Sequence, residues 1–140
     1  MRERSLIIVK PDAMAKGLAG TIIGRLQGLG LKLVALKMLR LDKAKARQHY
    51  AVHEGKPFFD SVVDYISSAP VVAAVLEGEE AIDVIRKAMG PTDPTRAEKS
   101  TIRGEFGLDI EKNAIHGSDS PETAAREIAL FFTEDEILDY

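Results

Sequence analysis

Two short apolar runs constrain the fold of this chain more than any other feature. Residues 5–10 (S-L-I-I-V-K) and 71–76 (V-V-A-A-V-L) are bounded by turn-forming residues, with Pro11-Asp12 after the first run and Pro70 and Gly78 around the second. Apolar runs of this length are typical of buried strands. The chain is therefore predicted to contain a sheet, and its first strand is predicted to end in a turn at Pro11.

The segments between and after these runs have mainly helical spacing. Apolar residues recur from Leu18 to Leu29 as on one face of a helix, and Asp42, Ser120 and Pro121 are residues that begin helices. We predict helices at residues 18–29, 42–50, 58–66, 82–89 and 121–132, and further strands at 31–41 and 114–115. This order suits an α+β sandwich with helices packed against a sheet. Residues 1–140 are predicted to form one domain.

Residues 90–107 lack periodicity and are predicted to form a long structureless loop, a feature that is usually functional in a compact domain. Basic side chains lie in or beside it, namely Arg86, Arg96, Lys99 and Arg103. Arginine forks match phosphate oxygens, whereas each arginine taken singly is more typical of a solvated or salt-bridged surface residue. No Walker A motif, Rossmann G-x-G-x-x-G or kinase H-R-D occurs, so a nucleotide site must be of another design.

Residues 113–120 (N-A-I-H-G-S-D-S) contain the candidate nucleophile, His116. A neutral imidazole is a competent nucleophile near neutral pH. Gly117 is expected to remove a Cβ that would obstruct an incoming group, and Glu127, at the edge of the next helix's apolar face, can fix the ring tautomer. From these residues alone, an ordinary polar turn remains the alternative interpretation.

The other two histidines, His49 and His53, are interpreted as surface or helix-end residues. They are four residues apart and could share a helix face. However, Gly55 and Pro57 crowd that helix end, and no ligand carboxylate is obvious nearby. We therefore expect no protein-bound metal site.

Seven segments, in order and nearly end to end, resemble the nucleoside diphosphate kinase family. They are residues 8–12 (IVKPD), 49–50 (HY), 56–59 (KPFF), 68–72 (SAPVV), 90–94 (GPTDP), 101–104 (TIRG) and 113–120. The resemblance implies a ferredoxin-like fold with an antiparallel four-stranded sheet covered by helices. It also implies ping-pong transfer of the γ-phosphoryl of a nucleoside triphosphate, typically ATP, to a nucleoside diphosphate through phosphohistidine at His116.

The resemblance also assigns roles to matching positions. The residues that it places on phosphates and ribose are Lys10, Arg86, Thr92, Arg103 and Asn113. The base would stack on Phe58 in an apolar slot with Val62 and Ile110. The residues that it places around His116 are Tyr50, Ser118 and Glu127. Mg²⁺ is expected to be bound mainly through the nucleotide phosphates.

Composition limits the other partners. The net charge is −3 at pH 7, no apolar run approaches the ~20 residues of a membrane span, and no signal peptide is evident. We therefore expect a cytoplasmic protein that binds neither membranes nor nucleic acid, and the resemblance implies a homo-oligomer, hexamer or tetramer. A non-catalytic nucleotide-binding or regulatory module is the alternative function.

Overall fold

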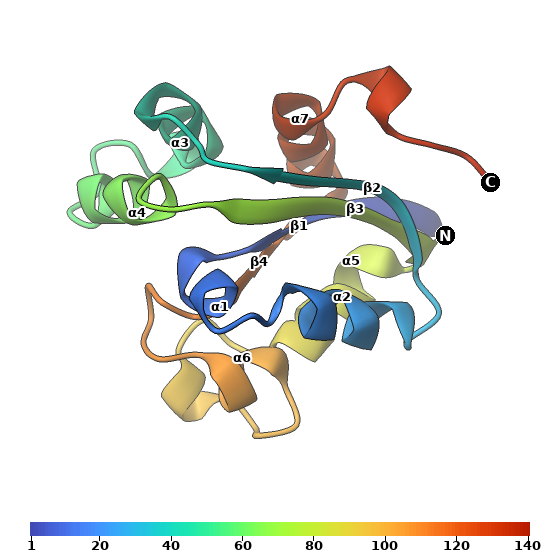
Figure 1. Cartoon of the computed structure of the whole chain (residues 1–140), viewed down its shortest axis with the longest axis horizontal. Coiled ribbons are helices and arrows are strands. Elements are labelled where there is room, and N and C mark those ends of the chain that lie inside the picture. Colours follow the sequence, from blue (N-terminus) through green and yellow to red (C-terminus); the bar gives the residue numbers. More distant parts are fainter.

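The computed structural model describes residues 1–140, and an antiparallel sheet of four strands runs through its middle (Figure 1). The strands are β1 (Arg2–Val9), β2 (Lys32–Leu39), β3 (Val71–Glu79) and β4 (Ile115–Gly117). Their order across the sheet is β2-β3-β1-β4, so β1 and β3 are central and β4 is a short edge strand. This architecture confirms the predicted ferredoxin-like α+β fold.

The central strands contain apolar runs, Leu6–Val9 in β1 and Val71–Leu76 in β3, because there the sheet is covered on both faces. Successive side chains of a strand point to opposite faces, so Ile7 and Val9 enter one core while Leu6 and Ile8 enter the other. Strand β3 alternates in the same way between the two cores. The two uninterrupted apolar runs of the sequence are thus the two strands that are buried on both sides.

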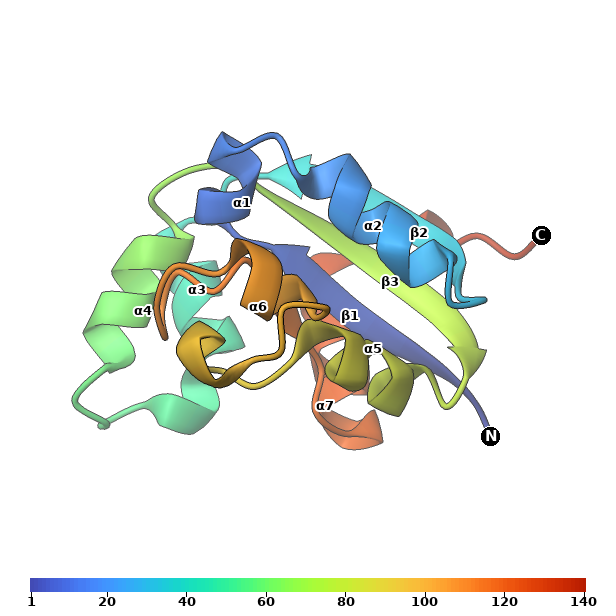
Figure 2. The ribbon, with the colours of Figure 1, turned by 90° about the horizontal axis from the view of Figure 1, so that it is seen from below.

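One helical layer covers the lower face of the sheet in Figure 1. It contains α1 (Pro11–Ala15), α2 (Ala19–Gln27), α5 (Ala81–Met89), α6 (Ile102–Phe106) and the 3₁₀ turn η2 (Pro94–Arg96). In the view from below, α1, α2, α5 and α6 lie in front of the strands (Figure 2).

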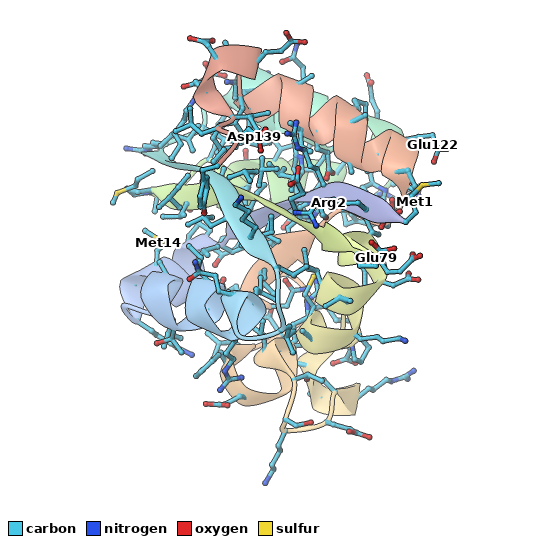
Figure 3. All side chains as sticks on the ribbon, turned by 90° about the vertical axis from the view of Figure 1, so that its right-hand side faces the viewer. Met1, Arg2, Met14, Glu79, Glu122 and Asp139 are labelled. Carbon is cyan, nitrogen blue, oxygen red and sulfur yellow. The ribbon has the colours of Figure 1, made fainter.

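The other layer covers the upper face. It contains α3 (Lys43–His49), η1 (Ala51–His53), α4 (Phe59–Ile66), α7 (Pro121–Phe131) and η3 (Glu134–Glu136). The end-on view of Figure 3 shows α7 on one side of the strands and α2 with α5 on the other. Asp42 caps α3 by accepting from Lys45 N at 2.7 Å, and Ser120 caps α7 by accepting from Thr123 N at 3.1 Å, as the sequence predicted.

Two sequence predictions were wrong, both over short elements. Residues 90–107 are not structureless, because they form η2 and α6, and Pro11 begins α1 instead of a turn. Proline is favoured in the first turn of a helix, where its missing N–H costs nothing. Helix α6 is only five residues long, too short for a hydrophobic period, and Thr101 caps it by accepting from Gly104 N at 3.0 Å.

Candidate active site

A cavity of about 720 Å³ lies beside the edge strand β4, where residues from both helical layers meet. Its walls include Lys10 just after β1, Arg86 on α5, Arg103 on α6, His116 on β4 and Glu127 on α7. The sheet ends at β4, its edge strand, and residues of both helical layers contact each other beyond that edge. Figure 2 shows the segment that follows α6 beside α4, and Ser61 Oγ donates to Glu111 Oε2 between them at 2.6 Å.

His116 is held by a buried carboxylate. Its Nε2 lies 3.0 Å from both Oε1 and Oε2 of Glu127, and Ser118 Oγ donates to Oε1 at 2.7 Å. Burial raises the pKa of Glu127, but the hydrogen bond and charge of His116, with smaller contributions from His49 and Ser118, outweigh it and lower that pKa overall. Glu127 is therefore an ionised acceptor, so Nε2 of His116 carries the proton. The lone pair is then on Nδ1, which has no protein hydrogen bond and is not among the fully buried side-chain atoms.

His49 was interpreted from the sequence as a surface or helix-end residue. It does end α3, but it is buried, with 2% exposure, and its ring centroid lies 4.6 Å from that of His116. Burial, followed by the neighbouring His116, lowers the pKa of His49 to about 3, so this imidazole is neutral. His53 is half-buried and lines the same cavity, with its ring centroid 5.2 Å from that of Phe58.

Four basic side chains line the cavity, namely Lys10, Arg86, Arg103 and Arg126. Burial and the nearby Arg103 lower the pKa of Lys10 to about 8, while burial and Arg86 lower the pKa of Arg103 to about 10. Lys10 Nζ donates to Asn113 Oδ1 at 2.9 Å and to Glu111 O at 3.0 Å. A cavity in which cations lower one another's pKa is a site prepared for a polyanion.

Hydrogen bonds between side chains and the backbone stabilise the polar wall of the cavity. Asn113 Nδ2 donates to Ile110 O at 2.9 Å and to Thr92 O at 3.1 Å. The next residue, Ala114, has a left-handed backbone with a φ of 75°. Its N–H donates to Asp12 Oδ2 at 3.0 Å, and its carbonyl accepts from Lys10 N at 2.9 Å, which holds this uncommon conformation in place.

The mouth of the cavity is apolar. Phe58 and Ile110 are 45% and 62% exposed, and Val62 lies in the same wall. Tyr50 is also part of the lining, and burial raises the pKa of its hydroxyl above the usual range, so it stays a neutral phenol. An exposed aromatic ring beside aliphatic side chains suits a flat apolar group such as a nucleobase.

Not every sequence-based idea about this region holds. Gly117 does not clear space for an incoming group, because a Cβ there would clash with Met89 and Ile85 in the lower core. Arg96 and Lys99 are exposed and do not line the cavity.

The lining residues that sequence reasoning missed are His49, Val52, His53, Glu111, Asp119, Thr123 and Arg126. Proximity in sequence to Tyr50, Asn113, Ser118 and Glu127 is the only signal that could have indicated them.

Comparisons with known proteins show which family the whole chain resembles. The family model described as nucleoside diphosphate kinase matches residues 3–137. A nucleoside diphosphate kinase of Dehalococcoides mccartyi is 54% identical over 138 residues, which cover 99% of this chain and 97% of the relative.

Two solved structures are also similar over nearly the whole chain. The halophilic nucleoside diphosphate kinase of Halobacterium salinarum in complex with CDP has a TM-score of 0.96 at 48% identity, covering 100% of this chain and 93% of that one. The transition-state mimic of the Borrelia burgdorferi enzyme with bound vanadate and ADP has a TM-score of 0.93 at 37% identity, covering 99% and 92%.

Proposed function

Because the chain belongs to the nucleoside diphosphate kinase family, we propose that its His116 imidazole carries the phosphoryl group between nucleotides. The enzyme is a phosphotransferase that moves the terminal phosphoryl group of a nucleoside triphosphate to a nucleoside diphosphate. The observation that carries the proposal is the orientation of the His116 ring, with Nε2 held by Glu127 and Nδ1 open to the cavity.

This orientation defines the chemical step. The Nδ1 lone pair attacks the γ-phosphorus, the bond from that phosphorus to the β–γ bridging oxygen breaks, and the nucleoside diphosphate leaves with the electron pair. Since Nε2 keeps its proton, the phosphorylated ring is cationic, and the Glu127 carboxylate at 3.0 Å stabilises that charge. A second nucleoside diphosphate then attacks the same phosphorus and restores the neutral imidazole.

The cavity walls suit a nucleotide whose phosphates lie at the basic residues and whose base lies at the apolar mouth. Lys10, Arg86 and Arg103 would neutralise phosphate charge, the free hydroxyl of Thr92 would donate to a phosphate oxygen, and Asn113 would bond the ribose. The base would lie at the mouth, against Phe58 and between Val62 and Ile110. Stacking on an aromatic face discriminates little between bases, so the enzyme should accept purine and pyrimidine nucleotides.

We propose that Mg²⁺ reaches the site on the nucleotide. The only group of three histidine or acidic side chains with ligating atoms close together contains two imidazoles, whereas Mg²⁺ prefers oxygen ligands. The basic residues Lys10, Arg86 and Arg103 fit a phosphate chain rather than a bare cation. When bound, Mg²⁺ supplies further neutralisation of the phosphate charge.

The phosphohistidine can be tested directly. Incubation with γ-labelled ATP and Mg²⁺ should give an acid-labile, base-stable label on the protein, which is chased into GTP when GDP is added. His116→Ala should lower the labelling rate by several powers of ten. His53→Ala is the matched control, since it removes a second histidine from the same cavity. Labelling of His116→Ala at the wild-type rate would refute the assignment, and binding of ADP without any labelling of the wild type would favour a non-catalytic module.

We also propose that the whole chain is one domain that forms a homo-oligomer, a hexamer or a tetramer, in the cytoplasm. Both cores pack on one sheet, which supports a single domain. Strand β2 has a free edge, and its Leu36 and Met38 are 55% and 66% exposed, which supports pairing with a second copy. None of the helices is long and apolar enough to cross a membrane. Light scattering should show assembly that Met38→Glu weakens.

A further inference from the structure

His49 is a buried titratable side chain that phosphoryl transfer does not use. It packs edge-on against Tyr50, His116 and Phe131, with ring centroids 4.7, 4.6 and 5.6 Å away. Neither of its ring nitrogens has a hydrogen-bond partner, although the residue is only 2% exposed. A phenyl ring would fill the same space without burying an unpaired N–H and lone pair, so the presence of the nitrogens needs another explanation.

One of these nitrogens is aimed at the carboxylate that holds His116. His49 Nδ1 lies 3.7 Å from Glu127 Oε2, and His116 Nε2 lies 3.0 Å from the same oxygen. One ligand atom from each of the three residues falls within 4.8 Å of the other two. Tetrahedral zinc, with bonds of about 2.0–2.2 Å, needs ligand atoms roughly 3.3 Å apart, so small side-chain movements would complete three corners.

We propose that His49, His116 and Glu127 form an inhibitory binding site for a divalent transition metal ion, of which Zn²⁺ is the representative. Two imidazoles and one carboxylate suit Zn²⁺ or Co²⁺ and disfavour Mg²⁺. Ser118 already holds Oε1 of Glu127 at 2.7 Å, which leaves Oε2 for the metal. The fourth position would be a water molecule from the cavity, which all three residues line.

The surrounding charges are compatible with such an ion. Arg126 Nη2 lies 3.9 Å from Glu127 Oε2 and opposes a cation, but its side chain is 40% exposed and can turn toward solvent. The ion would replace the charge-assisted contact of that arginine with the carboxylate.

Inhibition rests on the proposed role of His116 and follows from its tautomer. A metal on Nε2 takes the lone pair of that nitrogen, so the proton leaves Nε2 and a proton is taken up at Nδ1 from water. The imidazole keeps one proton and stays neutral, but the Nδ1 lone pair that would attack the γ-phosphorus is gone. The metal therefore blocks the nucleophile without lying between it and the nucleotide.

Binding is tested first without nucleotide, by calorimetric titration of the intact protein with Zn²⁺. We expect one Zn²⁺ per chain, weakened at least about tenfold by His49→Phe, which keeps an aromatic ring against His116. His53→Phe is the matched control and should change the Kd by less than about threefold. Nitrogen-15 NMR of the wild type should show metal bound at His116 Nε2 and a new N–H at Nδ1, a result that does not depend on any variant folding.

Inhibition is tested by the initial rate of phosphohistidine formation, with free Zn²⁺ set by a metal buffer and nucleotide saturated with Mg²⁺. Zn²⁺ should slow the wild type and His53→Phe at least about tenfold, reversibly with a chelator, but not His49→Phe relative to its own metal-free rate. Equal Zn²⁺ affinity in wild type and His49→Phe, an unchanged His116 tautomer, or Zn²⁺ bound without slower labelling would each overturn the proposal. Labelling of His116→Ala would instead refute the proposed function, and the calorimetric result would be unaffected by it.

Discussion

The central strands and the segment from Gly90 to Gly117 are held in place by different forces. Strands β1 and β3 are fixed by apolar side chains that alternate between two cores, and none of those side chains lines the cavity. The segment from Gly90 to Gly117 places Ile102 and Ile115 in one of these cores, but its cavity wall depends on polar side chains that bond to the backbone. Arg103 donates to Gly90 O at 3.1 Å and to Ile115 O at 2.9 Å, and Asn113 donates to two further carbonyls.

Substitutions of buried apolar residues in β1 and β3 should therefore change stability without changing activity. Substitutions of the polar residues that form the cavity wall in the segment from Gly90 to Gly117 should change both. Arg103 and Asn113 in the segment, and Lys10 that donates to it, hold the cavity wall and also face the cavity. One substitution there removes both a ligand contact and a support. The predictions below test this separation, from the largest expected effect to the smallest.

Among the substitutions that test this separation, Arg103→Ala should have the largest effect on activity. It removes a cation from the phosphate region and leaves the carbonyls of Gly90 and Ile115 without their donor. We expect kcat/KM to fall roughly 10²- to 10³-fold, as for loss of a preorganised donor to a developing charge. Steady-state kinetics with Arg96→Ala as the control checks this, because Arg96 is an exposed arginine of the same segment and should change kcat/KM less than about twofold.

Leu76→Ala should affect the opposite property. Leu76 lies in β3 and is absent from the cavity walls. It is fully buried in the core that also contains Ile7 and Val9. We expect the free energy of unfolding to fall by about 3 kcal/mol, with kcat unchanged while the protein is folded. Denaturant unfolding at fixed protein concentration measures it, with Leu108→Ala, an exposed leucine, as the control. A large loss of kcat in folded Leu76→Ala would contradict the separation.

Asp12→Ala should lower stability and activity together. The carboxylate accepts from Ala114 N at 3.0 Å and from Tyr65 Oη at 2.6 Å, and Ala114 is the left-handed residue between Asn113 and β4. Leaving the buried Ala114 N–H unpaired should cost about 2 kcal/mol of unfolding free energy, and kcat/KM should fall about tenfold. Tyr65→Phe removes the hydrogen bond from Tyr65 Oη but keeps the one between Ala114 N and Asp12. This variant should therefore lose part of the stability and little activity.

The sequence predicts the regions whose structure depends on local or periodic features. Residues 5–10 and 71–76 are strands in the structure, and the caps at Asp42 and Ser120 begin α3 and α7 as expected. Elements of three to five residues, such as η2 and α6, carry no period, so their existence depends on single hydrogen bonds that no pattern indicates.

The burial of His49 could not be predicted for a different reason. It lies at the end of a seven-residue helix whose sequence, K-A-K-A-R-Q-H, is mostly polar. What covers it is His116 and Phe131, more than sixty positions away in the chain. The resemblance to a family indicated which residues surround the candidate nucleophile, but the orientation of its ring and its second imidazole neighbour emerge only when α3 and α7 pack on the same face.

The smallest predicted effect is a pH dependence of nucleotide affinity that Lys10 controls. Burial and Arg103 lower the pKa of Lys10 to about 8 in the free protein, while an unfolded lysine has a pKa near 10.5. A bound phosphate raises the pKa of Lys10 again, so binding above pH 8 takes up a proton. The affinity for Mg²⁺-ADP should therefore fall as pH rises above about 8, by at most about tenfold per pH unit.

The contribution of Lys10 to the free energy of unfolding should rise over the pH range in which the nucleotide affinity falls. Between pH 8 and about 9.5, Lys10 binds more protons in the unfolded chain than in the native protein, so its contribution makes the free energy of unfolding increase with pH. Calorimetry in two buffers of different ionisation enthalpy measures the proton uptake, and denaturant unfolding measures stability. Lys10→Arg keeps its charge throughout this range. It should remove the slope of affinity and the Lys10 contribution to the slope of stability, even if its affinity is lower. If the slope of affinity persisted in Lys10→Arg, another group would be responsible for it. Lys10 would then support the cavity wall without binding phosphate.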